Sequence, residues 1–303
     1  MFYRALLLLL NGLLMLTLAG RALAEQQTLP PQYWGKIFSW TDKSLQHPTE
    51  GTMFEMLFEV TKQLPEYQHH YQAMSLTRGF TDLKSRDDLC MVGMRRSPER
   101  DQVGYFVGLW PVLPPQLVIR RADRHIIAGT QSSVSLAKLL GRNELRSAII
   151  EGRYFGPELD PLIHAAKATG QIQSLQTSSQ VNNLLRMLDM GRIDYTLDYV
   201  ETFLSSSVDQ PTLRDSLLLI PLEEVPTPSV TGIYCSRTPR GKQLIERIDK
   251  LTRDPQLQQR FKAHYTRFIP DEARQPYAQW LDTFFQQRSQ YSLTNLPESA
   301  ADL

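Results

Sequence analysis

The sequence has only two cysteines in 303 residues, Cys90 and Cys235. It lacks the Cys-x-x-Cys pairs and the Cys/His spacings of zinc or thiol-redox sites, so no such chemistry is indicated. Charge of one sign is also lacking, because 33 basic residues nearly balance 32 acidic ones. This balance gives no electrostatic case for binding nucleic acid or an anionic membrane. In an exported chain, two cysteines are compatible with one disulfide or with two buried thiols.

After residue 24 the sequence lacks any run of 18 apolar residues, so no transmembrane helix is predicted there. The first 24 residues have an apolar core, Ala5–Leu18, which follows Arg4 and precedes Ala22-Leu23-Ala24. This order is typical of a secretory signal peptide cleaved after residue 24. No lipid-attachment cysteine follows the cleavage motif. We therefore expect a periplasmic chain of 279 residues, in which the loss of Arg4 and Arg21 leaves 31 basic residues against 32 acidic ones.

Segments with strand and helix patterns alternate along the rest of the chain. Strands are predicted where apolar residues alternate or run together, and helices where they recur every three to four residues. The predicted strands are 33–40, 67–74, 89–92, 116–120, 148–150, 171–176, 191–197, 217–222 and 230–236. The predicted helices are 53–64, 76–83, 133–140, 159–166, 181–188, 244–251, one from 254 onward and 277–284. This alternation favours α/β layers with mostly parallel sheets.

His69 and His70 are the one pair that suggests a metal site. They lie in a predicted strand, where neighbouring side chains point to opposite faces and do not share an ion easily. We expect neither a metal nor another cofactor.

The strongest candidate for ligand recognition follows the buried strand 89–92. Ser97-Pro98 has the pattern of a helix N-cap with proline at the first helical position. Arg100 lies in that first turn, where its planar guanidinium can grip a carboxylate or a phosphate. An isolated arginine is more often a surface residue or an ion-pair partner, here of Glu99 or Asp101.

The signal peptide, the two α/β regions and three motifs together resemble solute-binding protein family 3, the type II periplasmic binding proteins that serve amino-acid transporters. Ser97-Pro98-Glu99-Arg100 resembles the family's Thr/Ser-x-x-Arg turn in the first lobe. Gly152-Arg153-Tyr154-Phe155-Gly156 resembles its glycine-rich turn, and Gly191-Arg192-Ile193-Asp194 the start of a second-lobe strand. The resemblance spans roughly residues 33 to 270. Leu64-Pro65-Glu66-Tyr67 and Cys90 are similar to marks of a divergent, mostly uncharacterised branch.

The resemblance implies an α/β fold of the two-lobed type II periplasmic-binding-protein class, with two hinge crossovers near 116–121 and 217–236. Lobe one is expected to comprise 25–119 and 230–285, lobe two 120–229, and 286–303 a flexible tail. In this fold the strands that carry Cys90 and Cys235 are neighbours, so the resemblance also implies a disulfide between them.

The resemblance further implies that Arg100 grips a ligand carboxylate from lobe one, with Gly93 and Arg95 beside it. Backbone N–H groups of Arg153, Tyr154 and Phe155, at a helix N-terminus, are expected to bind the same anion from lobe two. Trp40 and Tyr154 could add flat apolar surfaces for an aromatic or peptide-like acid.

One departure from the family concerns the ligand's ammonium group. Amino-acid binders place an aspartate where this chain has Tyr199, while Asp198 lies one residue early and Glu201 two residues late. A buried ammonium without a counter-charge is unfavourable by several kcal/mol. We therefore expect a carboxylate or similar anion that need not be a free α-amino acid, unless Asp198 or Glu201 takes the aspartate's place.

The expected function is that of a monomeric periplasmic solute-binding protein, without catalytic residues, that presents a small polar ligand to an inner-membrane ABC permease. One alternative is a ligand-sensing accessory protein for a membrane signalling partner. Another is a dehydratase-like enzyme on the same scaffold, in which Glu99 or Glu201 acts as general acid or base. The sequence shows no nucleophile–base constellation for such an enzyme.

Overall fold

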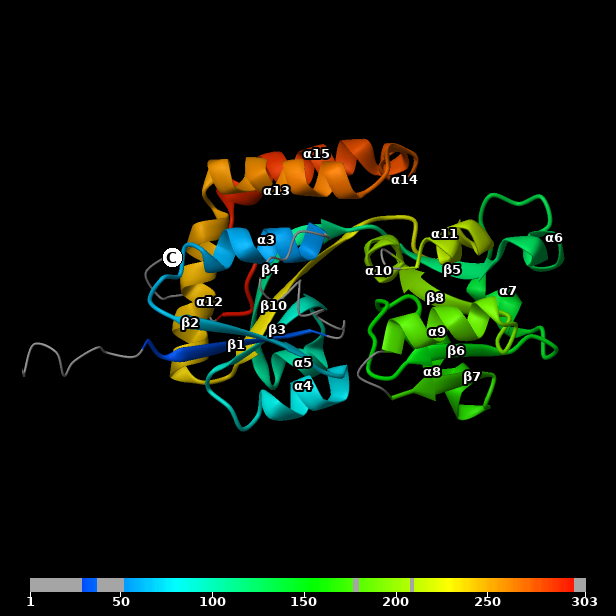
Figure 1. The fold of residues 1–303 in the computed structure, drawn as a ribbon, viewed down its shortest axis with the longest axis horizontal. Helices are drawn as coiled ribbons and strands as arrows, with labels where there is room; N and C mark the ends of the chain where they lie inside the picture. Colours follow the sequence, from blue (N-terminus) through cyan, green and yellow to red (C-terminus); the bar gives the residue numbers. More distant parts are fainter. Residues whose placement is uncertain (1–28, 37–51, 177–179, 208–209, 297–303) are drawn as a thin grey trace, which may run out of the picture.

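The computed structural model describes residues 29–36, 52–176, 180–207 and 210–296. They form two lobes side by side, each built on a five-stranded sheet with helices packed against it (Figure 1). The predicted two-lobed α/β fold is therefore confirmed. The predicted signal peptide and Trp40 lie outside the described residues.

The lobe-one sheet has the strand order β2-β1-β3-β10-β4. Its strands are β1 (Pro31–Lys36), β2 (Gln68–Ala73), β3 (Leu89–Arg95), β4 (Gly104–Val112) and β10 (Ser229–Ser236). Its helices are α3 (Thr52–Thr61), α4 (Leu76–Asp82), α5 (Pro98–Asp101), α12 (Pro239–Thr252), α13 (Pro255–Phe268), α14 (Asp271–Arg274) and α15 (Ala278–Gln287). The four C-terminal helices α12 to α15 follow β10 and complete lobe one (Figure 1).

The lobe-two sheet has the order β7-β6-β8-β5-β9. Its strands are β5 (Pro115–Arg120), β6 (Ser147–Ile150), β7 (Ile172–Leu175), β8 (Tyr195–Tyr199) and β9 (Leu217–Pro221). Its helices are α6 (Arg124–Ile127), α7 (Leu136–Leu140), α8 (Asp160–Ala168), α9 (Gln180–Asp189), α10 (Val200–Ser206) and α11 (Pro211–Ser216).

Both sheets are mixed: in each, four strands run in the same direction, as expected for mostly parallel sheets, and one strand runs against them. In lobe one β10 runs antiparallel to β3 and β4, and in lobe two β5 runs antiparallel to β8 and β9. Both β5 and β10 are the strands by which the chain enters one lobe from the other. Each follows a strand of the other lobe, β5 after β4 and β10 after β9, with no helix between. Parallel neighbours need a long crossover connection, usually a helix, so the pattern of alternating strands and helices does not apply to these two strands.

The chain crosses between the lobes twice, at 113–114 after β4 and at 222–228 after β9. Because all of β5 belongs to the second sheet, residues 115–119 lie in lobe two. The predicted lobe boundary at 119/120, and with it the first predicted crossover, was placed too late along the chain.

The core of lobe one follows from the helical periodicity of the sequence. Met56, Leu57 and Val60 are each at most 1 % exposed, because a 3.6-residue repeat puts them on the side of α3 that faces the sheet, and Leu64, just after the helix, is buried with them. Helices α12 and α13 bury similar stripes in the same cluster. Burial of each such side chain stabilises the fold by roughly 1.5–3 kcal/mol.

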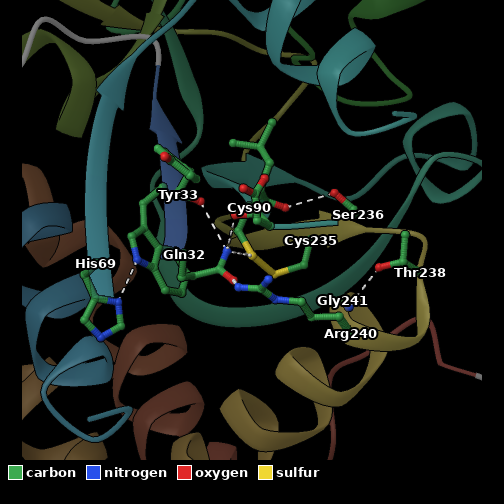
Figure 2. Close-up of a disulfide and its surroundings, with 12 residues drawn as sticks. Gln32, Tyr33, His69, Cys90, Cys235, Ser236, Thr238, Arg240 and Gly241 are labelled. Atoms are coloured by element: carbon green, nitrogen blue, oxygen red, sulfur yellow. Dashed lines mark hydrogen bonds between the residues drawn. A yellow bond between two sulfur atoms is a disulfide. The ribbon is translucent and has the colours of Figure 1, made fainter. Parts of the chain in front are cut away.

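Cys90 on β3 and Cys235 on β10 are directly paired across the sheet, and their sulfurs form the predicted disulfide (Figure 2). Gln32 on β1 is close to this bond, since its Nε2 donates to Cys90 Sγ at 3.4 Å and to Asp88 O at 2.9 Å. The cysteines are separated by 145 residues in sequence. The covalent loop therefore encloses all of lobe two.

His69 has a structural role in lobe one. Trp34 Nε1 lies 3.0 Å from His69 Nδ1, and His69 Nε2 lies 3.0 Å from the carbonyl oxygen of Leu64. The indole N–H can only donate, so Nδ1 accepts and Nε2 carries the proton. Within the described ranges no cluster of three histidine, cysteine or acidic side chains could hold a metal ion.

The expectation of a flexible tail from 286 is wrong for the described residues up to 296. Arg288 is fully buried, and its Nη2 donates to Gly108 O on β4 at 2.7 Å. Gly108 N donates to Leu293 O at 2.7 Å, and Asn295 Oδ1 accepts from the backbone of the same strand. The C-terminal segment 288–295 therefore runs along the outer edge of β4.

Candidate ligand-binding cleft

A cavity of ≈ 60 Å³ lies between the two lobes. The ends of β3 and β4 with helix α13 form its lobe-one wall, and the turn after β6 with the start of α10 forms the other. Its charged lining residues are Arg95, Arg100, Arg153 and Glu201. Mostly apolar walls with a few converging polar groups are the usual form of a small-molecule site.

Arg100 lies in the predicted capped turn. Ser97 Oγ accepts a hydrogen bond from Arg100 N at 3.4 Å and starts helix α5. The Arg100 guanidinium donates to Arg95 O at 2.8 Å within lobe one, and to Gly152 O of lobe two at 3.0 Å. Burial lowers its pKa, yet an arginine remains charged in proteins. Arg100 therefore joins the two lobes through a neutral carbonyl oxygen.

Arg95 makes a second bridge between the lobes. Its Nη1 donates to Phe155 O at 2.5 Å and to the hydroxyl of Tyr199 at 3.1 Å. Its guanidinium also lies 5.4 Å from the centre of the Tyr154 ring. Within the described part of the chain, neither Arg95 nor Arg100 has a carboxylate within ion-pair distance.

Arg153 belongs to lobe two and is paired there. Its Nη2 contacts Asp198 Oδ1 and donates to Thr202 Oγ1 at 2.9 Å, and both charged side chains are at least nine-tenths buried. Among the described residues, Arg153 Nη1 and Asp198 Oδ2 have no hydrogen-bond partner. Burial raises the pKa of Asp198 to about 6, although Arg153 opposes this shift.

The backbone N–H groups of the predicted anion site do not lie at a helix N-terminus, because helix α8 begins only at Asp160. Arg153 N donates to Ile150 O and Phe155 N donates to Asp160 Oδ1, within the same lobe. The Phe155 ring lies in the lobe-two core and is fully buried.

Tyr199 occupies the place where amino-acid binders carry an aspartate. Its hydroxyl donates to Tyr154 O at 2.7 Å and accepts from Arg95. Asp198, on the opposite face of β8, is held by Arg153 instead of lining the cavity. Of the predicted ligand residues, Gly93, Arg95, Arg100, Arg153, Tyr154 and Tyr199 line the cavity, whereas Phe155 and Asp198 do not.

Glu201 is a cavity residue that was considered in the sequence without being placed in the site. Its Oε1 accepts from Leu113 N at 2.8 Å and from Tyr265 OH at 2.7 Å, while Oε2 has no partner among the described residues. Burial raises the pKa of Glu201 to about 7. Trp110, Tyr265 and Phe268 also line the cavity. The sequence signal that could have identified Glu201 is an acidic residue in the first turn of α10, directly after the buried strand β8.

Comparisons with known proteins find relatives by structure only, since no family model and no curated protein matches the sequence. A chain from work on glutathione import via GshT and the cystine ABC importer TcyBC of Streptococcus mutans is 17% identical, with a TM-score of 0.56 over 80% of this chain and 98% of that one. An ancestral arginine-binding protein bound to arginine is 15% identical, with a TM-score of 0.57 over 79% of this chain and 98% of that one.

A histidine kinase sensor domain with similarity to periplasmic binding proteins is 12% identical, with a TM-score of 0.58 over 79% of this chain and 96% of that one. The chain therefore has the two-lobed fold of the periplasmic binding proteins. No helix within the described ranges is both long and apolar enough to span a membrane.

Proposed function

We propose that the protein is a periplasmic solute-binding protein, a divergent member of family 3, which closes its lobes around a small carboxylate-bearing ligand and presents it to an inner-membrane ABC permease. One observation carries the proposal. Arg95 and Arg100 extend from lobe one across the interlobe cavity to lobe two, and their partners there are neutral oxygens.

The physical argument concerns charge in a sheltered cleft. A carbonyl oxygen satisfies one guanidinium N–H but leaves the positive charge without a counter-ion. A carboxylate supplies that charge and can accept two parallel hydrogen bonds. A ligand that contacts both walls favours the closed arrangement by its differential affinity for it, so binding and lobe closure are coupled.

A membrane signalling partner is the second candidate. The kinase sensor domain with a similar fold favours it, because that domain is attached to a signalling protein rather than to a permease. Both candidates share the binding step and differ in the membrane partner. If deletion of a neighbouring permease gene abolishes uptake of the ligand, the transport function is favoured. If loss of the protein leaves uptake intact but abolishes the cell's response to the ligand, the signalling function is favoured.

The proposal includes no catalytic step. Glu201 is the acid that an enzyme in this cleft could use, but its Oε1 is already bonded to Leu113 N and Tyr265 OH. A purified protein that converts its bound ligand would support the dehydratase-like alternative over a binding protein.

The test begins with mass spectrometry of small molecules released from natively purified protein, followed by calorimetry with the identified ligand. Arg100→Ala is expected to weaken binding by about 10- to 150-fold, since a hydrogen bond to a charged group contributes about 1.5–3 kcal/mol. Arg96→Ala is the matched control, because Arg96 is half-exposed and paired with Asp101 outside the cavity. Unchanged affinity in Arg100→Ala would contradict the assignment of this arginine to the ligand.

A further inference from the structure

Basic side chains outnumber acidic ones among the residues that line the cleft. The guanidiniums of Arg95, Arg100 and Arg153 line it together with one carboxyl group, that of Glu201, whose pKa burial raises to about 7. Among the described residues, only Arg153 of these three has an acidic partner within ion-pair distance, namely Asp198. Glu158 and Asp160 contribute charge from outside the lining, and Asp160 already accepts a hydrogen bond from Phe155 N. Two cationic groups are thus left facing a small, mostly apolar space.

The place expected for a ligand ammonium is occupied by protein cations. The Tyr199 hydroxyl accepts from Arg95 Nη1 at 3.1 Å, and the Arg153 guanidinium carbon lies 5.2 Å from the centre of the Tyr199 ring. An ammonium brought to this point would meet two like charges in a poorly solvated site, where charge repulsion is strong. An anionic group would instead be attracted there, by Arg95 directly and by Arg153 less strongly, because Asp198 already pairs with Arg153.

Donors are also available for a second anionic group. Arg153 Nη1 lacks a hydrogen-bond partner among the described residues, its side chain is only 6 % exposed, and the residue lines the cavity. A buried N–H that is left without an acceptor is unfavourable, so an oxygen of the ligand at this position relieves an existing penalty.

We propose that the ligand is a small dianion without an ammonium group, such as a dicarboxylate or a phosphate, held by Arg95 and Arg100 at one end and reached by Arg153 at the other. This inference rests on the proposed binding function and goes beyond it by specifying the ligand's charge.

Glu201 allows a second measurement that tests the proposal, namely proton uptake when the ligand binds. It lines the same cavity, is close to Asp198, and is bonded through Oε1 to Tyr265 OH and Leu113 N. A dianion placed beside Glu201 disfavours its charged form, and a protonated Oε2 can donate a hydrogen bond to the ligand. Binding near neutral pH is therefore expected to take up a proton.

The experiment is calorimetry at pH 7.5 on the mature protein, with matched ligands that differ in one group. Succinate and glutarate are expected to bind at least 50-fold more tightly than propionate, and at least 10-fold more tightly than their aminated counterparts, aspartate and glutamate. Inorganic phosphate is titrated in a separate experiment, which distinguishes a phosphate ligand from a dicarboxylate. Repetition in buffers of different ionisation enthalpy measures proton uptake, which should be lost in Glu201→Gln while the dianion still binds.

Arg95→Gln is expected to remove the preference for dianions, whereas the exposed Arg96→Gln leaves it intact. Tighter binding of aspartate than of succinate, or no binding of any dianion, would overturn the inference. The proposed binding function would survive either result if an amino acid, a peptide or a monocarboxylate binds. It fails only if none of these binds and no small molecule is released from the native protein.

Discussion

Replacement of Glu201 with glutamine is expected to flatten the pH dependence of the protein's stability. Burial raises the pKa of this carboxyl group from 4.5 to about 7 in the folded protein. Between those two values the folded state binds more protons than the unfolded state, so the free energy of unfolding falls as the pH rises. At 1.36 kcal/mol for each pKa unit, the loss from pH 4 to pH 8 is about 3 kcal/mol.

Glutamine is a suitable probe because its side-chain carbonyl can still accept from Leu113 N and Tyr265 OH, while the ionisation is removed. Urea unfolding followed by tryptophan fluorescence at pH 5, 6, 7 and 8 measures the effect. We expect wild type and Glu201→Gln to be about equally stable at pH 5, and the variant to be more stable by about 3 kcal/mol at pH 8. Asp198 contributes to the pH dependence of both proteins, so the difference between them reports on Glu201.

The exposed Glu272 provides a control, since Glu272→Gln changes the same group without a buried site. Parallel stability curves for wild type and Glu201→Gln would refute the reasoning, because they would mean that Glu201 titrates alike in the folded and unfolded chains.

Three further outcomes are expected. Cys90→Ala/Cys235→Ala should lower the free energy of unfolding by about 5 kcal/mol in the chain-entropy model, given the 145-residue separation, and a urea midpoint unchanged from that of the oxidised wild type would contradict this. Arg288→Ala should destabilise by about 3–5 kcal/mol, because it removes the buried guanidinium that bonds Gly108 O and Asp249 Oδ1 and leaves the buried Asp249 only its longer pair with Arg253; a melting temperature equal to that of wild type would oppose it. N-terminal sequencing of the exported protein should begin at residue 25, and retention of Met1 would exclude the predicted cleavage.

Local patterns predicted the elements of this fold well. The stripe of α3, the Ser97 cap of α5 and the strands β5, β9 and β10 are set by spacing that a single segment contains, whereas strand β4 was not predicted. The strands β5 and β10 were predicted, but their antiparallel direction was not, because it depends on the lobe from which the chain enters the sheet. The packed C-terminal segment was missed for another reason. Arg288 and Asn295 bond to the backbone of β4, and such bonds leave no periodicity in the sequence.

The cleft was predictable in part. The turn motif identified Arg100 as a cavity residue, but its partner Gly152 belongs to the other lobe, and no local pattern specifies which carbonyl a lobe presents. Pairing of Asp198 with Arg153, in the turn after β6, depends on the face of β8 from which the Asp198 side chain projects, and no local pattern specified that face, so Asp198 was expected in the cavity.

The C-terminal segment along β4 and the insertion of lobe two within lobe one together determine the order in which the chain can fold. Lobe two is a continuous stretch, and its sheet is complete once β9 has emerged. Lobe one begins earlier, but its sheet needs β10, and its edge strand is covered only when residues 288–295 arrive. Pairing across such long sequence separations is slow, and an uncovered edge strand can associate with other chains in the meantime. A growing chain therefore carries a folded second lobe inside an incomplete first lobe until residues 288–295 have been synthesised.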